Sequence, residues 1–118
     1  MSRGKQSPIF AKTYDFLLWL LGRTARFPKN ERFRLAKRLE ERAFVFHDLL
    51  LQAGRLPAGQ RGEKRRLLTR ADVELDRLRF TVRLCQDLKL FSFKQYEYCA
   101  GRLVELGRLL GGWLKSLA

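Results

Sequence analysis

Histidine and cysteine are scarce in this sequence, which removes most of the chemistry that depends on them. His47 is the only histidine, so one chain can build neither a histidine-paired nucleophile nor a two-histidine metal site. We expect His47 to lie on a helix surface beside Asp48. Cys85 and Cys99 are the only cysteines, and they predict neither a disulfide framework nor a zinc site. This cysteine usage is typical of a reducing, cytoplasmic setting.

Catalytic and cofactor-binding motifs are also missing. The chain has no glycine-rich phosphate loop, no Walker motif and no serine on a strand-to-helix elbow. Three acids, Asp72, Asp76 and Asp87, fall on one flank of a predicted helix. Arg79 and Arg83 alternate with them at helical spacing, which predicts surface ion pairs. We therefore expect no catalytic residue, no bound metal and no cofactor, and the protein is predicted not to be an enzyme.

No apolar run is long enough to cross a membrane. The longest, residues 16–21, falls far short of the roughly 18 residues that a spanning helix requires. Residues 1–7 are read as a short basic N-terminal arm without a small-residue cleavage site, so export is not expected. Peripheral binding to an anionic membrane is a further alternative, although the apolar stripes are needed for the protein's own core.

What the sequence has in excess is positive charge. The formal net charge is +13 and the pI about 10.7, so the surface attracts polyanions, nucleic acid first. Arginine outnumbers lysine by 17 to 8, and guanidinium groups bind phosphate through two parallel hydrogen bonds. Cations cluster at two predicted helix ends where acids are almost absent. The clusters include Lys29 and Arg32 in the first and Arg65, Arg66 and Arg70 in the second.

The aromatic residues favour backbone-directed binding over base stacking. The phenylalanines and tyrosines are expected to occupy core stripes for the most part, which leaves few rings for bases to stack on. Phosphate contacts without sequence preference are therefore the better interpretation. The alternative is that the arginines serve only solubility.

The hydrophobic pattern predicts four helices. Ser7-Pro8 marks the first helix start, because serine caps free amides and proline loses no hydrogen bond at the first helical position. This helix is expected to end near Arg26. The other three are expected over residues 30–54, residues 63–90 and, after a capping box of Ser92 and Gln95, up to Leu117. Residues 54–62 are the one substantial loop.

Each predicted helix has an apolar stripe at alternating spacings of three and four residues. The stripe of the first helix is Phe10, Tyr14, Leu17 and Leu21, that of the second runs from Ala36 to Ala53, and that of the third runs from Leu68 to Cys85. A second stripe, Val73, Phe80 and Leu84, lies on the opposite side of the third helix. Gly107 and Gly111 lie one turn apart on the fourth, where glycines predict the close approach of another backbone.

These features predict an all-α fold, an up-down-up-down antiparallel four-helix bundle in which residues 1–118 form a single domain. A monomer would leave the second stripe of the third helix and the glycine face of the fourth exposed to water. We therefore expect the bundle to be oligomeric. The residues expected at subunit contacts are Val73, Phe80, Leu84, Gly107, Gly111 and Trp113.

Several motifs resemble a known family of four-helix bundle proteins. The segment Phe27-Pro28-Lys29-Asn30-Glu31-Arg32-Phe33 resembles the junction between that family's first two helices. One branch comprises proteins encoded in intervening sequences of 23S ribosomal RNA genes. The other is Avd, the accessory variability determinant of diversity-generating retroelements.

The second half of the chain is similar to the Avd branch, and the resemblance covers about residues 14–115. The matching motifs include Leu78-Arg79-Phe80, Asp87-Leu88-Lys89-Leu90 and Gly107-Arg108-Leu109-Leu110-Gly111-Gly112-Trp113. The intervening-sequence branch usually has Asn-Ile-Ala-Glu-Gly at the end of the second helix. Here that place reads Asp48-Leu49-Leu50-Leu51-Gln52-Ala53-Gly54.

The resemblance implies a cytoplasmic, barrel-shaped homopentamer that associates with the retroelement's reverse transcriptase and its template-repeat RNA, with DNA as a further nucleic-acid partner. The complex would make the adenine-mutagenised complementary DNA of mutagenic retrohoming, and polymerisation would belong to the reverse transcriptase. Arg79 and Arg83 fall within a matching motif and are the first candidates for contacts with nucleic acid or the polymerase. Lys29, Arg32, Arg65, Arg66 and Arg70 come second, from clustering. The alternative is a self-associating bundle of the intervening-sequence type with generic nucleic-acid binding.

Overall fold

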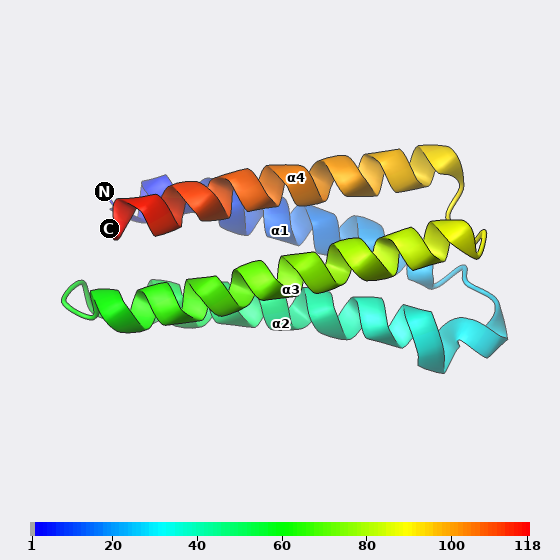
Figure 1. The fold of residues 1–118 in the computed structure, drawn as a ribbon, viewed down its shortest axis with the longest axis horizontal. Coiled ribbons are helices and arrows are strands. Elements are labelled where there is room, and N and C mark those ends of the chain that lie inside the picture. Colours follow the sequence, from blue (N-terminus) through cyan, green and yellow to red (C-terminus); the bar gives the residue numbers. More distant parts are fainter. Residues whose placement is uncertain (1) are drawn as a thin grey trace.

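Four long helices run up and down beside one another, as the sequence predicts (Figure 1). The computed structural model describes the backbone of residues 2–118 and the side chains of residues 8–118. The helices are α1 (Ser2–Thr24), α2 (Lys37–Arg55), α3 (Arg61–Asp87) and α4 (Phe93–Ser116). α1 packs against α2 and α4, and α3 packs against the same two helices, so α1 and α3 occupy opposite corners. The molecule measures 47 × 24 × 19 Å.

The buried faces of α2 and α3 are the predicted stripes. The α2 stripe from Ala36 to Ala53 is buried, and so is the α3 stripe from Leu68 to Cys85. Both helices repeat large apolar residues every three or four positions, and that local period aligns one face with the centre of the bundle. The fully buried side chains of α2 and α3 include Leu39, Phe46, Leu50, Leu68, Leu75, Leu78 and Val82.

The stripe predicted for α1 is wrong in part: Leu17 is buried and Phe10 packs against the core, but the buried face is rotated away from the other two predicted residues. Tyr14 is 66% exposed and Leu21 is also exposed, whereas the buried face contains Ile9, Thr13 and Phe16 together with Leu20. Thr13 is tolerated in the core because its hydroxyl donates a hydrogen bond of 2.7 Å to the Ile9 carbonyl. A polar residue on the inner face and apolar residues on the outer face hid the true period.

The helix ends also differ from the prediction. The helix start at Ser7-Pro8 is wrong, because α1 begins at Ser2 and Pro8 lies inside it; the side chains of the basic arm lie outside the described residues. α1 ends at Thr24, two residues before the predicted end. A 3₁₀ turn (Lys29–Glu31) and a π-helical turn (Arg32–Ala36) precede α2. The predicted loop is shorter than 54–62, since its first two and last two residues are helical.

The turn between α3 and α4 begins earlier than predicted. α3 ends at Asp87 because Lys89 adopts a left-handed conformation with φ of 64°. The Leu90 amide then donates 2.8 Å to the Cys85 carbonyl, which closes the helix without a glycine. The predicted capping box is confirmed, with reciprocal hydrogen bonds of 3.0 and 3.1 Å between Ser92 and Gln95.

Both thiols lie in the core, and burial raises the pKa of each to about 12 from an ordinary 9.0. The charge of Glu31 adds to the shift of Cys85, and Cys85 adds to that of Cys99. The folded protein therefore holds these protons in a range where the unfolded chain releases them. The resulting stability is fully present below pH 9 and is lost as the pH rises from about 9 towards 12.

We expect both thiols to resist Ellman's reagent in the native protein at pH 8 and to react fully in denaturant, because only unfolding exposes the thiolates. The urea midpoint should fall between pH 9 and pH 10.5, and a Cys85→Ala/Cys99→Ala variant should lose part of that fall. Rapid labelling of the native protein, or identical pH profiles for the two proteins, would contradict the prediction.

Candidate functional site

The two predicted basic clusters lie at opposite ends of the bundle (Figure 1). Lys29 and Arg32 are in the turns before α2, whereas Arg65, Arg66 and Arg70 are in the first half of α3, at the end that also holds the chain termini. All five side chains are exposed. Successive connections in an up-down bundle alternate between its ends. The clusters therefore do not form one continuous surface on a single chain 47 Å long.

Several arginines of the α3 cluster are engaged within the chain. Arg61 and Arg65 donate to backbone carbonyls at the end of α4, including that of Leu117. Arg66 donates to both carboxylate oxygens of Glu63, at 3.0 and 2.6 Å. This contact lowers the pKa of the Glu63 carboxyl and raises the pKa of Arg66. Of the predicted residues in this cluster, Arg70 has no ion-pair partner among the described side chains.

Arg79 and Arg83 differ in how far they are committed to the fold. Arg79 pairs with Asp76 at 2.8 Å, as the interleaved pattern predicts. Its guanidinium lies over Gly107, where an added Cβ would be 2.7 Å from Nη2. Arg83 is exposed and has no ion-pair partner among the described side chains. Of the two, Arg83 is the more available for an external anion.

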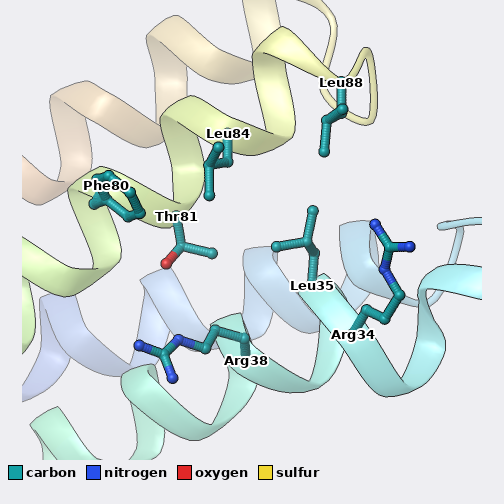
Figure 2. A pocket seen from close by; sticks show the side chains of 7 residues that line it. All are labelled: Arg34, Leu35, Arg38, Phe80, Thr81, Leu84 and Leu88. Atoms are coloured by element: carbon teal, nitrogen blue, oxygen red, sulfur yellow. The ribbon is translucent and has the colours of Figure 1, made fainter.

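A groove between α3 and the segment formed by the π-helical turn and the start of α2 combines apolar and cationic side chains (Figure 2). Leu35, Leu84 and Leu88 point toward one another across it, while Arg34 and Arg38 flank it from the α2 side. Its volume is about 380 Å³, enough for one large side chain. We call this the α3 groove, and its lining is Arg34, Leu35, Arg38, Phe80, Thr81, Leu84 and Leu88.

A buried ion-pair network continues from the α3 groove along the same two helices. Glu74 is only 5% exposed, and both of its carboxylate oxygens accept hydrogen bonds from Arg42 of α2, at 3.0 and 3.1 Å. Arg77 adds a third bond of 2.7 Å. Two cations compensate one desolvated carboxylate, so the network joins α2 to α3 and leaves residual positive charge at the surface.

The expected placing of the aromatic residues is wrong. Six phenylalanines and tyrosines are exposed, and Phe80 is 68% exposed at the edge of the α3 groove. Aromatic residues usually mark a core in a helical pattern, and this hid their surface position. The exposed members are Tyr14, Phe33, Phe44, Phe80, Phe93 and Tyr98. Only for Phe80 did the sequence indicate exposure, because it lies on the predicted second stripe of the third helix.

The predicted subunit-contact residues fall into two groups. Val73, Phe80 and Leu84 are exposed on α3, as a second stripe requires. The close backbone predicted at the glycines is not found within the described chain: the side chain of Arg79 lies against Gly107, and nothing approaches Gly111 within 4 Å. Trp113 packs partly against the core and meets the Phe10 ring edge-on at 6.1 Å. The α3 members and Gly111, which is also exposed, are therefore the predicted contact residues left free for a partner.

The remaining polar groups offer little chemistry. His47 is partly exposed beside Asp48, as predicted, with Nδ1 3.5 Å from the carboxylate. In residues 8–118 no histidine, cysteine, aspartate and glutamate side chains gather in a group that could hold a metal ion. No helix in the described part of the chain has the length and apolar character needed to cross a membrane.

Comparison with known proteins places this geometry in context. A family model described as bAvd-like matches residues 8–117. The fold is similar to that of a protein of unknown function from the S23 ribosomal protein family of Bacteroides thetaiotaomicron, with a TM-score of 0.84 and 16% identity. The alignment covers 94% of this chain and 98% of the other. At that identity the likeness shows a shared fold. No curated protein matches the sequence.

Proposed function

The chain belongs to the bAvd-like family, and from that membership we propose that it is the non-enzymatic accessory protein of a diversity-generating retroelement. It binds the reverse transcriptase of the element and the template-repeat RNA, and it supports mutagenic synthesis of complementary DNA and retrohoming. The observation that carries the proposal is the family match over residues 8–117, which includes all of α2, α3 and α4.

The charge distribution supports an RNA partner. The net charge is +13, and exposed cations at both ends and along α3 supply the phosphate contacts that sequence-tolerant binding needs. Arg83, Arg70, Lys29 and Arg32 are the residues assigned to RNA or reverse transcriptase. Arg79, Arg65 and Arg66 contribute positive potential while keeping their contacts within the chain.

Self-association is part of the proposal. The family resemblance implies a homopentamer, and Val73, Phe80 and Leu84 form an exposed apolar strip on α3 that a subunit contact would cover. A ring of several copies would present the same cations repeatedly to one RNA, which multiplies weak phosphate contacts.

The decisive experiment is co-purification with the reverse transcriptase encoded beside this chain, with and without the template RNA, followed by mass determination through light scattering. We expect several copies of this chain bound to one polymerase. Loss of the complex under both conditions would contradict the proposal. An Arg83→Gln variant tests whether the α3 surface is used, and Arg66→Gln is the matched control, because it removes the same single charge from an arginine already bound to Glu63.

The second candidate is a self-associating bundle of the intervening-sequence type. The fold likeness to the S23 family protein favours it at the level of architecture alone. The two candidates differ in genomic context, because only the retroelement role requires a reverse-transcriptase gene and a template repeat nearby. Their absence would favour the second candidate.

A further inference from the structure

In the described part of the chain, nine of the thirteen exposed large apolar side chains lie on two different surfaces of the bundle. One is the α3 groove together with Val73. The other lies on α1 and the adjoining side of α2, and we call it the α1 patch: Tyr14, Leu18, Leu21, Phe44 and Leu51. A monomeric helix rarely leaves so many large apolar residues in water on the side away from its core. Each surface therefore needs a partner.

The α1 and α2 residues of the α1 patch lie next to one another, because the two helices pack together along this side of the bundle. Glu40 of α2 accepts a hydrogen bond from Thr24 of α1, and the His47 ring meets that of Phe10 with centroids 6.5 Å apart. Phe44 and Leu51 follow Glu40 and His47 by one helical turn each, so they lie on the α1 side of α2. The patch therefore spans the junction of the two helices.

The outer face of α1 is poor in charge. Its exposed positions between residues 11 and 25 carry one charged residue, Asp15, and no cation. Asp15 has no ion-pair partner among the described side chains. The face is completed by small residues, Ala11, Gly22 and Ala25. An apolar surface with an unpaired carboxylate at its edge is complementary to a protein surface that is apolar and cationic.

The α3 groove has that complementary chemistry. Leucines and Phe80 line it, Arg34 and Arg38 flank it, and Arg38 has no ion-pair partner among the described side chains. Its volume of about 380 Å³ suits a protruding Leu18 or Tyr14. Copies of a chain with a net charge of +13 repel one another. A contact that brings the free acid of one copy to the free arginine of the next offsets that repulsion locally.

We propose that the α1 patch of one copy binds in the α3 groove of the next, head to tail, with Leu18 inserted beside Phe80 and Asp15 facing Arg38. This inference rests on the self-association in the proposed function and names its contact. The contact joins two unlike surfaces, so every copy keeps one free patch and one free groove until the assembly closes.

The two surfaces lie on different sides of α2. The patch extends from α1 onto α2, and the groove lies between α3 and the start of α2. Because the two surfaces differ, each added copy is related to the previous one by the same rotation, and the assembly closes into a ring where that rotation closes. Arg83 is exposed and is not among the residues that line the groove.

The test uses two substitutions that each damage one half of the contact. Leu18→Asp removes the patch and leaves the groove intact, whereas Phe80→Asp does the reverse. We expect each variant alone to fall to the monomer mass of 13.9 kDa. Mixed in equal amounts, they should form a one-to-one heterodimer and nothing larger, because only one intact patch and one intact groove can meet. Val104→Asp, at an exposed α4 position, should keep the wild-type mass.

Other outcomes contradict the contact. If Leu18→Asp or Phe80→Asp keeps the wild-type mass, or if the mixture stays monomeric, the patch does not bind the groove. Formation of the heterodimer also shows that both variants fold. A charge exchange is a second test: Asp15→Arg and Arg38→Asp should each weaken assembly, and the double variant should restore it. Failure of that rescue overturns the Asp15–Arg38 pairing.

The result also separates this inference from the proposed function. An oligomer that survives Leu18→Asp contradicts the head-to-tail contact and leaves the accessory role intact. Failure of wild-type protein to bind the reverse transcriptase contradicts the accessory role, whatever the mixing experiment gives.

Discussion

The Glu74→Ala variant is expected to have a free energy of unfolding about 3 kcal/mol lower than that of the wild-type protein. Glu74 accepts hydrogen bonds from Arg42 and Arg77, and its side chain is almost fully buried between α2 and α3. Removing the carboxylate leaves the partly buried Arg42 without its counter-charge and opens a gap in the α2–α3 packing. The loss lies near the low end for broken buried pairs because Arg77 reaches water.

The matched control is Asp76→Ala on the same helix. Asp76 also accepts from an arginine, but its side chain is 73% exposed, so its loss should change stability by less than about 1 kcal/mol. Urea denaturation monitored by circular dichroism measures both variants. A second control replaces both buried partners, Arg42→Met with Glu74→Met, and should recover most of the lost stability. Equal destabilisation by Glu74→Ala and Asp76→Ala would contradict the importance of burial.

The affinity for single-stranded RNA is expected to fall by about 300-fold between 50 and 200 mM salt, since a protein that contacts about six phosphates of a single strand releases about four counterions. The net charge of +13 and the spread of exposed cations make such a footprint reachable by even one copy. Fluorescence anisotropy with a labelled oligonucleotide at several salt concentrations gives the slope. A flat salt response would contradict phosphate-directed binding.

Two arginines on α3 make the matched comparison for that slope. Arg83→Ala removes a guanidinium without an ion-pair partner among the described residues and should reduce the slope by about one. Arg66→Ala removes one that is already bound to Glu63 by two hydrogen bonds, so it should change the slope much less. Equal slopes for the two variants would show that the ion pairs seen within the chain do not decide which arginines meet RNA.

The candidate site could be predicted only in part from the sequence. The interleaving of Asp76 with Arg79 indicated an ion pair, and the structure confirms it. The same pattern did not separate Arg79 from Arg83, because the difference comes from α4: only Arg79 lies against Gly107. Arg65 was grouped with free cations, yet it binds the Leu117 carbonyl, 52 residues away. A contact between residues so far apart in the sequence cannot be predicted from the spacing of residues along one helix.

The sequence by itself determined the number and type of the helices, the buried faces of α2 and α3, and the family. These follow from local rules, since the apolar period of a helix and a capping box are read over a few neighbouring residues. The family follows from an ordered set of motifs along most of the chain.

Only the tertiary structure decided the rotation of α1 and the grouping of Leu35, Arg38, Leu84 and Leu88 in one groove. α1 is apolar on both sides, so its own pattern does not predict which side packs inward. The side that is buried is determined by packing against α2 and α4. The groove joins residues of two helices whose relative register is fixed by packing and by the Arg42–Glu74 pair. Which side chains remain free for a partner is therefore a property of the assembled bundle.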